Sequence, residues 1–253
     1  MEKGLAIVTG ASAGLGVCLA REAAASGYRP LLVARRQDRL EALAETLPGA
    51  LVFAADLTAP DAIEALMGFA AAEGPVTALI NNAGFGQSGP LVEGSRDKDL
   101  AMIDLNVRAL VDLTHRVLPG MVAAGRGGVM NVASAAGFQP GPNASVYYAT
   151  KAFVVSFSEA ISAEMAGTGV TVTALCPGPT ETEFFAVSGM DKVRLRKVLS
   201  PMSAEAVARI GWRGFVRGRR VVVPGWRTKF AVLAGRHAPR TLTLPMVKAL
   251  QSR

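Results

Sequence analysis

Residues 5–16 form the stretch Leu5-Ala6-Ile7-Val8-Thr9-Gly10-Ala11-Ser12-Ala13-Gly14-Leu15-Gly16, an apolar run followed by a glycine-rich turn. The run has the length of a buried strand, and a helical pattern follows the turn. Glycine permits positive φ and close backbone approach, while the N-terminus of the next helix offers free N–H groups to a pyrophosphate. By itself the turn predicts either a dinucleotide site or a tight strand-to-helix connection. As a dinucleotide site it would use Gly10, Ser12, Ala13, Gly14, Leu15 and Gly16.

The spacing of the glycines argues against other nucleotides. Three residues separate Gly10 from Gly14, which departs from the commoner G-x-G-x-x-G pattern. The turn also lacks the Gly-Lys-Ser/Thr ending of a nucleotide-triphosphatase loop. Kinase and ATPase functions are therefore disfavoured.

Apolar runs alternate with helical stretches along the whole chain. The predicted strands are 5–9, 30–34, 51–54, 77–80, 128–132, 170–175 and 220–223. The predicted helices lie near 15–26, 37–46, 60–72, 96–124, 145–166 and 203–217. This alternation predicts an α/β fold, a Rossmann-like, doubly wound, seven-stranded and mostly parallel sheet with helices on both faces.

Length and composition predict one domain. The chain has 253 residues, half of them hydrophobic, and no repeat or linker divides it. We expect a single dinucleotide-binding and catalytic domain over 1–253, with a substrate lid at about 177–203 and a basic C-terminal extension at about 224–253. In a doubly wound fold the 177–203 segment would lie beside the ligand crevice.

The start of the chain and its cysteines indicate a cytoplasmic protein. The apolar run before Thr9 is too short for a signal peptide or a spanning helix. Cys18 and Cys176 lie far apart, which favours two reduced thiols over a disulfide. His115 and His237 are isolated, so no metal site is predicted.

The positive charge is concentrated at one end. Residues 191–253 contain 15 Lys and Arg against Asp191 and Glu205. No zinc-finger, basic-zipper or RNA-stacking motif accompanies this charge, so a nucleic-acid partner is not expected.

Two further motifs complete a recognisable set. Asn81-Asn82-Ala83-Gly84 follows the fourth predicted strand, and Tyr147-Tyr148-Ala149-Thr150-Lys151 lies on the helix predicted at 145–166. With the glycine-rich turn, their spacing resembles the classical short-chain dehydrogenase/reductase (SDR) family over nearly the whole chain. The string from Asn131 to Pro179 resembles a bacterial branch of that family with general oxidoreductase names. The resemblance implies that Asn82, Ala83 and Gly84 contact a dinucleotide.

The end of the second strand indicates which dinucleotide is bound. In Rossmann-type folds this position faces the adenosine ribose, where an acid binds the 2′-hydroxyl and an arginine accepts a 2′-phosphate. Here Ala34 replaces the acid, and Arg35 and Arg36 follow it. NADP(H) is therefore the expected cofactor, the alternative being that both arginines begin a solvated helix. Asp56 and Leu57 resemble the family's adenine-contacting pair.

Tyr147 and Lys151 are four residues apart, so on a helix they share one face. A tyrosine has an ordinary pKa of about 10, and a nearby ammonium favours its phenolate form. The resemblance implies that Tyr147 gives a proton to the carbonyl oxygen and that Lys151 also binds the nicotinamide ribose. Tyr148 is rotated about 100° around the helix and is expected to have a structural or pocket-lining role.

The family pattern implies further site residues. Ser134 matches the serine that hydrogen-bonds the reacting oxygen, and Asn106 matches the asparagine that supports the site and a proton-carrying water. The remaining cofactor contacts implied by the family's Pro-Gly segment are Pro177, Gly178, Thr180 and Thr182, with Thr182 preferred over Thr180 for the hydroxyl contact.

The residues after these motifs are largely apolar and favour a lipophilic carbonyl substrate. They are Phe85, Gly86, Gly137, Phe138, Gln139, Pro140, Phe184, Phe185 and Met190. The expected function is interconversion of a carbonyl and a secondary alcohol on a lipophilic small molecule or acyl thioester. The alternative is a dinucleotide-sensing binding protein on the same fold.

The partners remain open at this stage. The resemblance implies a homodimer or homotetramer built partly on the helices after Arg96 and Ser145. In the basic C-terminal quarter, Phe230, Leu233, Ala234 and His237 have helical spacing, which suits an anionic membrane or an acidic acyl carrier protein. The favoured alternative is an ordinary terminal helix packed on the sheet.

Overall fold

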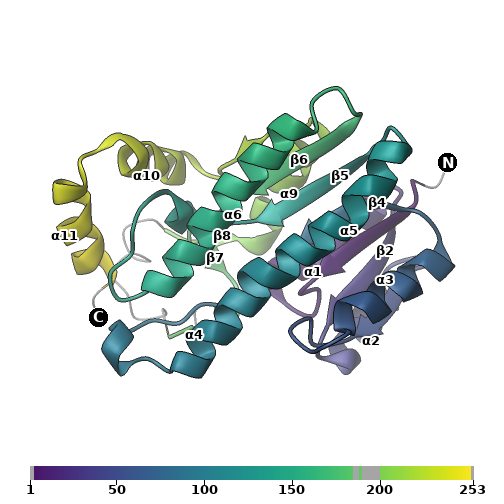
Figure 1. The fold of residues 1–253 in the computed structure, drawn as a ribbon, viewed down its shortest axis with the longest axis horizontal. Helices are drawn as coiled ribbons and strands as arrows, with labels where there is room; N and C mark the ends of the chain where they lie inside the picture. Colours follow the sequence, from purple (N-terminus) through teal and green to yellow (C-terminus); the bar gives the residue numbers. More distant parts are fainter. Residues whose placement is uncertain (1–2, 185–187, 190–199, 252–253) are drawn as a thin grey trace.

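The computed structural model describes residues 3–184, 188–189 and 200–251, and its centre is one parallel sheet (Figure 1). The strands are β1 (Leu5–Thr9), β2 (Arg29–Ala34), β3 (Leu51–Ala54), β4 (Val76–Asn81), β5 (Gly127–Val132), β6 (Val170–Leu175) and β9 (Val221–Val222). Their order is β3-β2-β1-β4-β5-β6-β9, and every neighbouring pair is parallel. The predicted doubly wound, seven-stranded sheet is confirmed, with a last strand shorter than the predicted 220–223.

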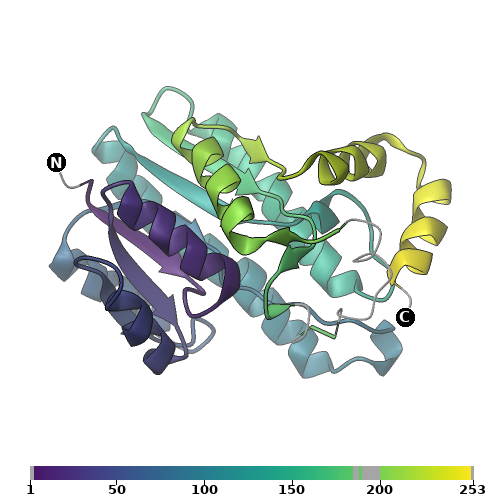
Figure 2. The same ribbon diagram turned by 180° about the vertical axis from the view of Figure 1, so that it is seen from behind.

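Helices cover both faces of the sheet because its strands are apolar on both sides. In β1, Ala6 and Val8 pack into one buried cluster, while Leu5 and Ile7 pack into the other. The first cluster is closed by α1 (Gly14–Ala25), α2 (Gln37–Ala44) and α9 (Ala204–Val216) (Figure 2). The second is closed by α3 (Ala62–Glu73), α5 (Leu110–Ala123) and α6 (Ser145–Glu164). Two buried faces account for strands that are continuous apolar runs.

The helix predicted over 96–124 is interrupted. It consists of α4 (Arg96–Ile103), a π-helical segment (Asp104–Ala109) and α5. A π-helical turn inserts one extra residue, and such insertions are frequent at functional sites. Asn106 lies within this segment and is buried.

Part of the predicted lid region is ordered by a small second sheet. β7 (Thr180–Glu181) pairs in parallel with β8 (Met202–Ser203), which leads directly into α9. Of the predicted pocket-lining residues, Phe185 and Met190 lie outside the described part of the chain.

The basic C-terminal extension forms α10 (Trp226–His237) and α11 (Arg240–Gln251). The expectation that a terminal helix packs on the sheet is wrong. α10 contacts the 3-10 turn Ala135–Phe138, and both helices extend beyond the edge of the sheet (Figures 1 and 2). The sheet faces are already filled by other helices, which leaves these two to pack at its end. None of the described helices is both long and apolar enough to cross a membrane.

The reversal of strand order places the carboxyl ends of β1 and β4 side by side. One side chain, Asn82, joins them: its Nδ2 donates to the Thr9 carbonyl at 2.9 Å and to the Gly10 carbonyl at 3.3 Å. In return the Thr9 hydroxyl accepts the N–H groups of Asn82 and Ala83 at 3.0 and 2.9 Å. The crevice of a doubly wound sheet lies at this point.

The glycine-rich turn is packed so closely here that a side chain has no room at Gly16. A Cβ at Gly16 would lie 2.2 Å from the Gly10 carbonyl oxygen and 2.7 Å from Asn82 Nδ2. Both neighbours are fixed, one by the backbone and the other by its hydrogen bonds.

We expect Gly16→Ala to lower the free energy of unfolding by about 1–3 kcal/mol, because overpacking forces the turn away from Asn82. The matched control is Gly68→Ala within α3, where no atom lies within 4 Å of the new Cβ. That control should gain about 0.5–1 kcal/mol from helix propensity. Urea denaturation of both variants checks the pair, and equal stabilisation of both would contradict the proposed close packing.

Candidate active site

Tyr147, Lys151 and Ser134 come together at the carboxyl edge of the sheet. Tyr147 and Lys151 project from α6, and Ser134 lies two residues after the end of β5. The Ser134 hydroxyl hydrogen-bonds the Tyr147 phenol and also accepts the N–H of Ala136 at 3.1 Å. Tyr147 and Lys151 are both buried, at 8% and 5% exposure.

Burial, rather than the lysine, dominates the pKa of Tyr147. Removal from water disfavours the phenolate and raises the pKa of Tyr147 to about 12, against a smaller lowering by the Ser134 hydrogen bond. The expected lowering by Lys151 is therefore not seen. The phenol stays protonated at neutral pH, which is the form of a proton donor.

Lys151 is held in place by the sheet. Its Nζ donates to the Val132 carbonyl at 2.7 Å. Burial lowers the pKa of Lys151 to about 8, because a buried ammonium loses its hydration. The ammonium is thus the main form at neutral pH, with one of its three donors bound to Val132.

Asn106 reaches the same region from the π-helical segment. Its Oδ1 accepts the Phe85 N–H at 3.1 Å, and its Nδ2 donates to the Phe85 carbonyl at 2.9 Å and to Thr150 Oγ1 at 3.2 Å. A Cβ at Gly84 would lie 2.8 Å from Asn106 Oδ1 and 3.6 Å from Lys151 Nζ. Gly84 therefore allows Asn106 and Lys151 to approach the loop after β4.

The glycine-rich turn has the features of a phosphate cradle. Gly10 and Gly14 have φ values of 67° and 53°, a region that favours glycine. α1 begins at Gly14 after Ala13, whose methyl group cannot cap the helix, and its first turn contains no acid. The first N–H groups and the partial positive charge of the helix suit a pyrophosphate. Leu15 packs partly buried against the first core cluster, so its backbone is the part available to a ligand.

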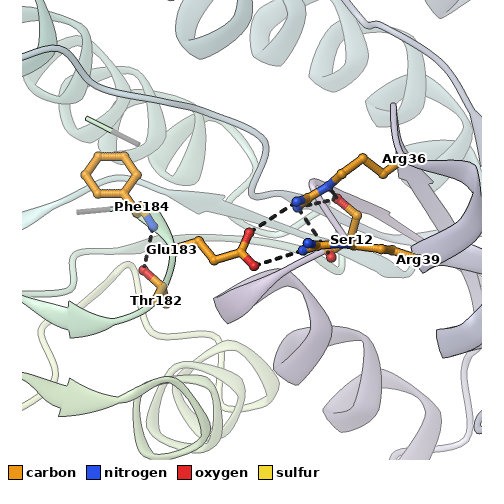
Figure 3. Close-up of polar contacts among 6 residues, drawn as sticks. All are labelled: Ser12, Arg36, Arg39, Thr182, Glu183 and Phe184. Atoms are coloured by element: carbon orange, nitrogen blue, oxygen red, sulfur yellow. Dashed lines mark hydrogen bonds and ion pairs between the residues drawn. The ribbon is translucent and has the colours of Figure 1, made fainter. Parts of the chain in front are cut away.

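Arg35 and Arg36, the arginines predicted to bind a 2′-phosphate, differ in their hydrogen bonds and ion pairs. The Arg36 guanidinium donates to Ser12 Oγ at 3.2 and 3.1 Å and to Glu183 Oε2 at 3.2 Å. Arg39 donates to the other oxygen of Glu183 at 2.9 Å (Figure 3). Arg35 keeps a side chain that is 79% exposed, 4.0 Å from Asp56.

Glu183 was not predicted from the sequence. Its carboxylate comes from the segment after β7 and lies between the two guanidinium groups (Figure 3). The hydrogen bonds from Arg39 and Arg36 lower the pKa of Glu183. Arg36 and Glu183 are 147 residues apart in the sequence, so only the folded chain reveals their contact.

Asp56 and Leu57 lie at the end of β3 with different surroundings. Asp56 Oδ1 accepts the Thr58 N–H at 2.9 Å and the Thr58 hydroxyl at 2.7 Å. These bonds lower the pKa of Asp56, with the backbone N–H as the largest cause. The Leu57 side chain is buried in the second core cluster. Its backbone, rather than its side chain, faces any ligand at this edge.

The Pro-Gly segment after β6 packs against the glycine-rich turn. The Pro177 carbonyl accepts the Ala135 N–H at 2.8 Å, and a Cβ at Gly178 would lie 2.5 Å from Thr228 Oγ1. The Thr180 hydroxyl donates to the Gly178 carbonyl at 3.0 Å. A Cβ at Gly14 would lie 2.9 Å from Thr182 Cγ2, which places Thr182 against the turn. This geometry favours Thr182 over Thr180 as the ligand-facing threonine.

An apolar cluster surrounds the Tyr147 ring. Its ring centroid lies 5.5 Å from that of Phe184 and 6.1 Å from that of Tyr148. The cluster contains Met102, Ala144, Tyr147, Tyr148 and Val247, with Phe85, Ala136, Val146 and Phe184 packed against it. The Gln251 amide of α11 donates to the Tyr148 hydroxyl, a contact that sequence analysis did not anticipate. Tyr148 thus has the structural surroundings expected of it.

The comparisons with known proteins agree with this geometry. Residues 4–192 match the family model described as short chain dehydrogenase. Sulfoacetaldehyde reductase of Chromohalobacter salexigens is 39% identical over 212 residues, covering 79% of this chain and 83% of the relative. The NADP-dependent 3-hydroxy acid dehydrogenase YdfG of Salmonella typhi is 39% identical over 188 residues, covering 72% of this chain and 75% of the relative.

A solved structure extends the likeness to the whole fold. The short-chain dehydrogenase of Sphingobium yanoikuyae in complex with NADPH has a TM-score of 0.81 and 32% identity, and the match covers 99% of this chain and 98% of that chain. By fold, site geometry and sequence, this chain belongs to the short-chain dehydrogenase family of oxidoreductases.

Proposed function

We propose that the chain is an NADP(H)-dependent oxidoreductase that interconverts a carbonyl and a secondary alcohol on a lipophilic small molecule or acyl thioester. The observation that carries the proposal is the buried Tyr147 phenol, hydrogen-bonded to Ser134 and one helical turn from Lys151. A protein that only senses a dinucleotide has no need for a proton donor aimed at a second ligand. Relatives named for reductase and NADP-dependent dehydrogenase activity support the same proposal.

The cofactor would be held by the cradle at the crevice. The glycine-rich turn would bind the pyrophosphate, and Asn82, Ala83 and Gly84 would also contact the dinucleotide. Pro177, Gly178 and Thr182 would contact the nicotinamide end. When bound, the nicotinamide supplies a hydride to the carbonyl carbon or accepts one from the alcohol.

Side chains of this protein carry out the proton transfer. The Tyr147 phenol, protonated at neutral pH, donates to the substrate oxygen during reduction. The Ser134 hydroxyl holds that oxygen within reach of the phenol and stabilises its developing charge. Lys151 uses its free donors on the cofactor ribose, and Asn106 fixes the loop after β4 beside it. Oxidation of the alcohol uses the same contacts in reverse.

The preference for NADP(H) rests on Arg35. Arg36 and Arg39 already share the Glu183 carboxylate, whereas Arg35 is largely exposed and lies near Asp56 only at 4.0 Å. A guanidinium whose ion pair is this long and this exposed can turn to a 2′-phosphate at little cost. Ser12, bound by Arg36, lies next to the same region.

Apolar surroundings support a lipophilic substrate. The cluster around Tyr147 brings Phe85, Phe184 and Met102 to the reacting side chain. Apolar walls with a few polar groups suit a lipophilic carbonyl better than a sugar or a charged acid.

The proposal also includes the organisation of the protein. Residues 1–253 would form one dinucleotide-binding and catalytic domain in the cytoplasm, with 177–203 as a substrate lid. A homodimer or homotetramer would bury the exposed apolar side chains of α4 and α6, among them Leu100, Ile103 and Phe153.

Tyr147→Phe should lower turnover by roughly 10²–10⁴-fold, because general acid catalysis contributes about that much. NADPH affinity should stay nearly unchanged. The matched control is Tyr148→Phe, which removes a hydroxyl bound to Gln251 and should keep turnover. Steady-state kinetics and fluorescence titration with NADPH check both variants. Loss of turnover in Tyr148→Phe instead would show that the wrong tyrosine was assigned.

Arg35→Ala should weaken NADPH binding by roughly 10–100-fold and leave NADH binding almost unchanged, since a charge-assisted hydrogen bond is worth about 1.5–3 kcal/mol. Arg126→Ala, at the opposite end of the sheet before β5, serves as the control for loss of a surface charge.

Glu183→Gln should act in the other direction, because it frees Arg36 and Arg39 for the phosphate. An exposed ion pair is worth about 0.2–1 kcal/mol, so the expected tightening for NADPH is roughly two- to fivefold. Glu181→Gln is the control for the loss of a nearby carboxylate. Equal effects on NADPH and NADH affinity in Arg35→Ala or Glu183→Gln would contradict binding of the 2′-phosphate by these arginines.

A further inference from the structure

The two C-terminal helices have no role in the proposed chemistry, yet they carry a distinctive surface. We call α10 and α11, residues 226–251, the C-terminal arm. The arm extends beyond the edge of the sheet next to α6 (Figures 1 and 2). Its inner side meets the active-site end of the protein through Val247 and Gln251.

The outer side of α10 is an apolar stripe. Trp226, Phe230 and Leu233 are 75%, 71% and 58% exposed. Their spacing of four and then three residues places them on one face of the helix. The buried residues of the same helix, Thr228 and Gly235, lie on the opposite face. The large side chains of α10 therefore point away from the protein.

α11 repeats the arrangement. Leu242 and Met246, one turn apart, are 67% and 49% exposed. The buried residues Thr243, Val247 and Gln251 form the face turned toward the protein. Both helices of the arm thus have a buried inner face and an apolar outer face.

All the charge on the arm is positive. Residues 226–251 contain Arg227, Lys229, Arg236, Arg240 and Lys248 and no aspartate or glutamate. None of the ion pairs formed among the described residues includes any of these five. Lys229 and Arg236 lie beside the α10 stripe, about one-fifth and one-quarter of a turn from its centre.

We infer that the C-terminal arm docks on an anionic lipid surface, with the outer apolar stripes in the headgroup region and the cations beside them, such as Lys229 and Arg236, among the lipid phosphates. Interfacial helices combine Lys and Arg on their polar side with Trp, Phe and Leu on the other, as the arm does. Cations close to such a surface strengthen the binding and make it dependent on salt. An anionic bilayer thus supplies both the negative charge and the apolar environment that the arm lacks.

Two other occupants fit less well. In a symmetric contact between two copies the same patch meets itself, so five uncompensated cations from each copy would be brought together. An acidic protein would supply the charge, but a protein partner is normally recognised through a groove or pocket for its anchor residues. An open cavity of about 530 Å³ lies beside the arm. Because its lining includes Arg240 and Leu244 of the arm and Tyr148 and Ala152 of α6, with Gln139 nearby, it lies on the inner side, between the arm and α6. The outer stripes are better matched by a deformable lipid surface.

The chain contains its own reporter for this test. It has two tryptophans, Trp226 at 75% exposure and Trp212 at 3%. Purified full-length protein is mixed with vesicles of phosphatidylcholine alone or of phosphatidylcholine with phosphatidylglycerol. We expect co-sedimentation and a blue shift of the Trp226 emission only with the anionic vesicles, and both should weaken as salt is raised. Trp226→Phe removes the spectral shift and identifies its source.

The double variant Phe230→Ser/Leu233→Ser should weaken vesicle binding at least about tenfold, because it removes two large apolar side chains from the outer stripe. Val92→Ser, on the 3-10 turn Leu91–Glu93 and 93% exposed, is the matched control and should bind normally. Turnover of a soluble ketone should be unchanged in both. Vesicle binding needs no turnover, so this test is independent of the proposed reductase activity.

Three outcomes would overturn the inference. One is the absence of binding to anionic vesicles at low salt. Another is a Trp226 emission that is already blue-shifted without lipid, together with a molecular mass in solution that rises with protein concentration and is lower in Phe230→Ser/Leu233→Ser. That result would assign the surface to a second copy. The third is salt-sensitive binding to an acidic acyl carrier protein with no binding to vesicles, which would assign it to a protein partner.

Discussion

The site depends on the junction between β1 and β4, where the Asn82 amide bonds the carbonyls of Thr9 and Gly10. The strand order makes these two strands neighbours although about seventy residues separate them. Gly16 then lets α1 start within van der Waals contact of the turn. Three features of the site follow from this one junction. They are a cradle with free N–H groups, a fixed loop that carries Gly84, and the approach of Asn106 and Lys151 to that loop. A shift of the junction would move each of them.

Burial is the second organising effect, and it acts on the two central side chains in opposite directions. It raises the pKa of Tyr147 to about 12 and lowers that of Lys151 to about 8. Both shifts have the same cause, the loss of hydration of the charged form. They leave a neutral phenol and an ammonium at neutral pH, a pair suited to proton donation and ribose binding. Apolar neighbours such as Phe184 and Met102 contribute to the burial that keeps the Tyr147 phenol neutral.

Sequence analysis predicted the sheet because its signals were local. The run Leu5–Thr9, the glycine spacing and the four-residue step from Tyr147 to Lys151 each lie within one or two elements. The π-helical segment around Asn106 escaped prediction, and so did the bonds from the Asn106 side chain to the Phe85 backbone, 21 residues away in the sequence. Glu183 and Gln251 were missed for the same reason. The course of α10 and α11 depended on which faces of the sheet were already filled, and no local pattern records that.

The most direct test of the account is the affinity of the purified protein for NADPH and NADH, followed by oxidation of the tighter cofactor with lipophilic ketones, aldehydes and 3-oxoacyl thioesters. We predict tighter binding of NADPH and turnover of at least one member of this panel. Tight binding of NADPH with no turnover across a wide panel would contradict the role given to Tyr147 and would favour a dinucleotide sensor.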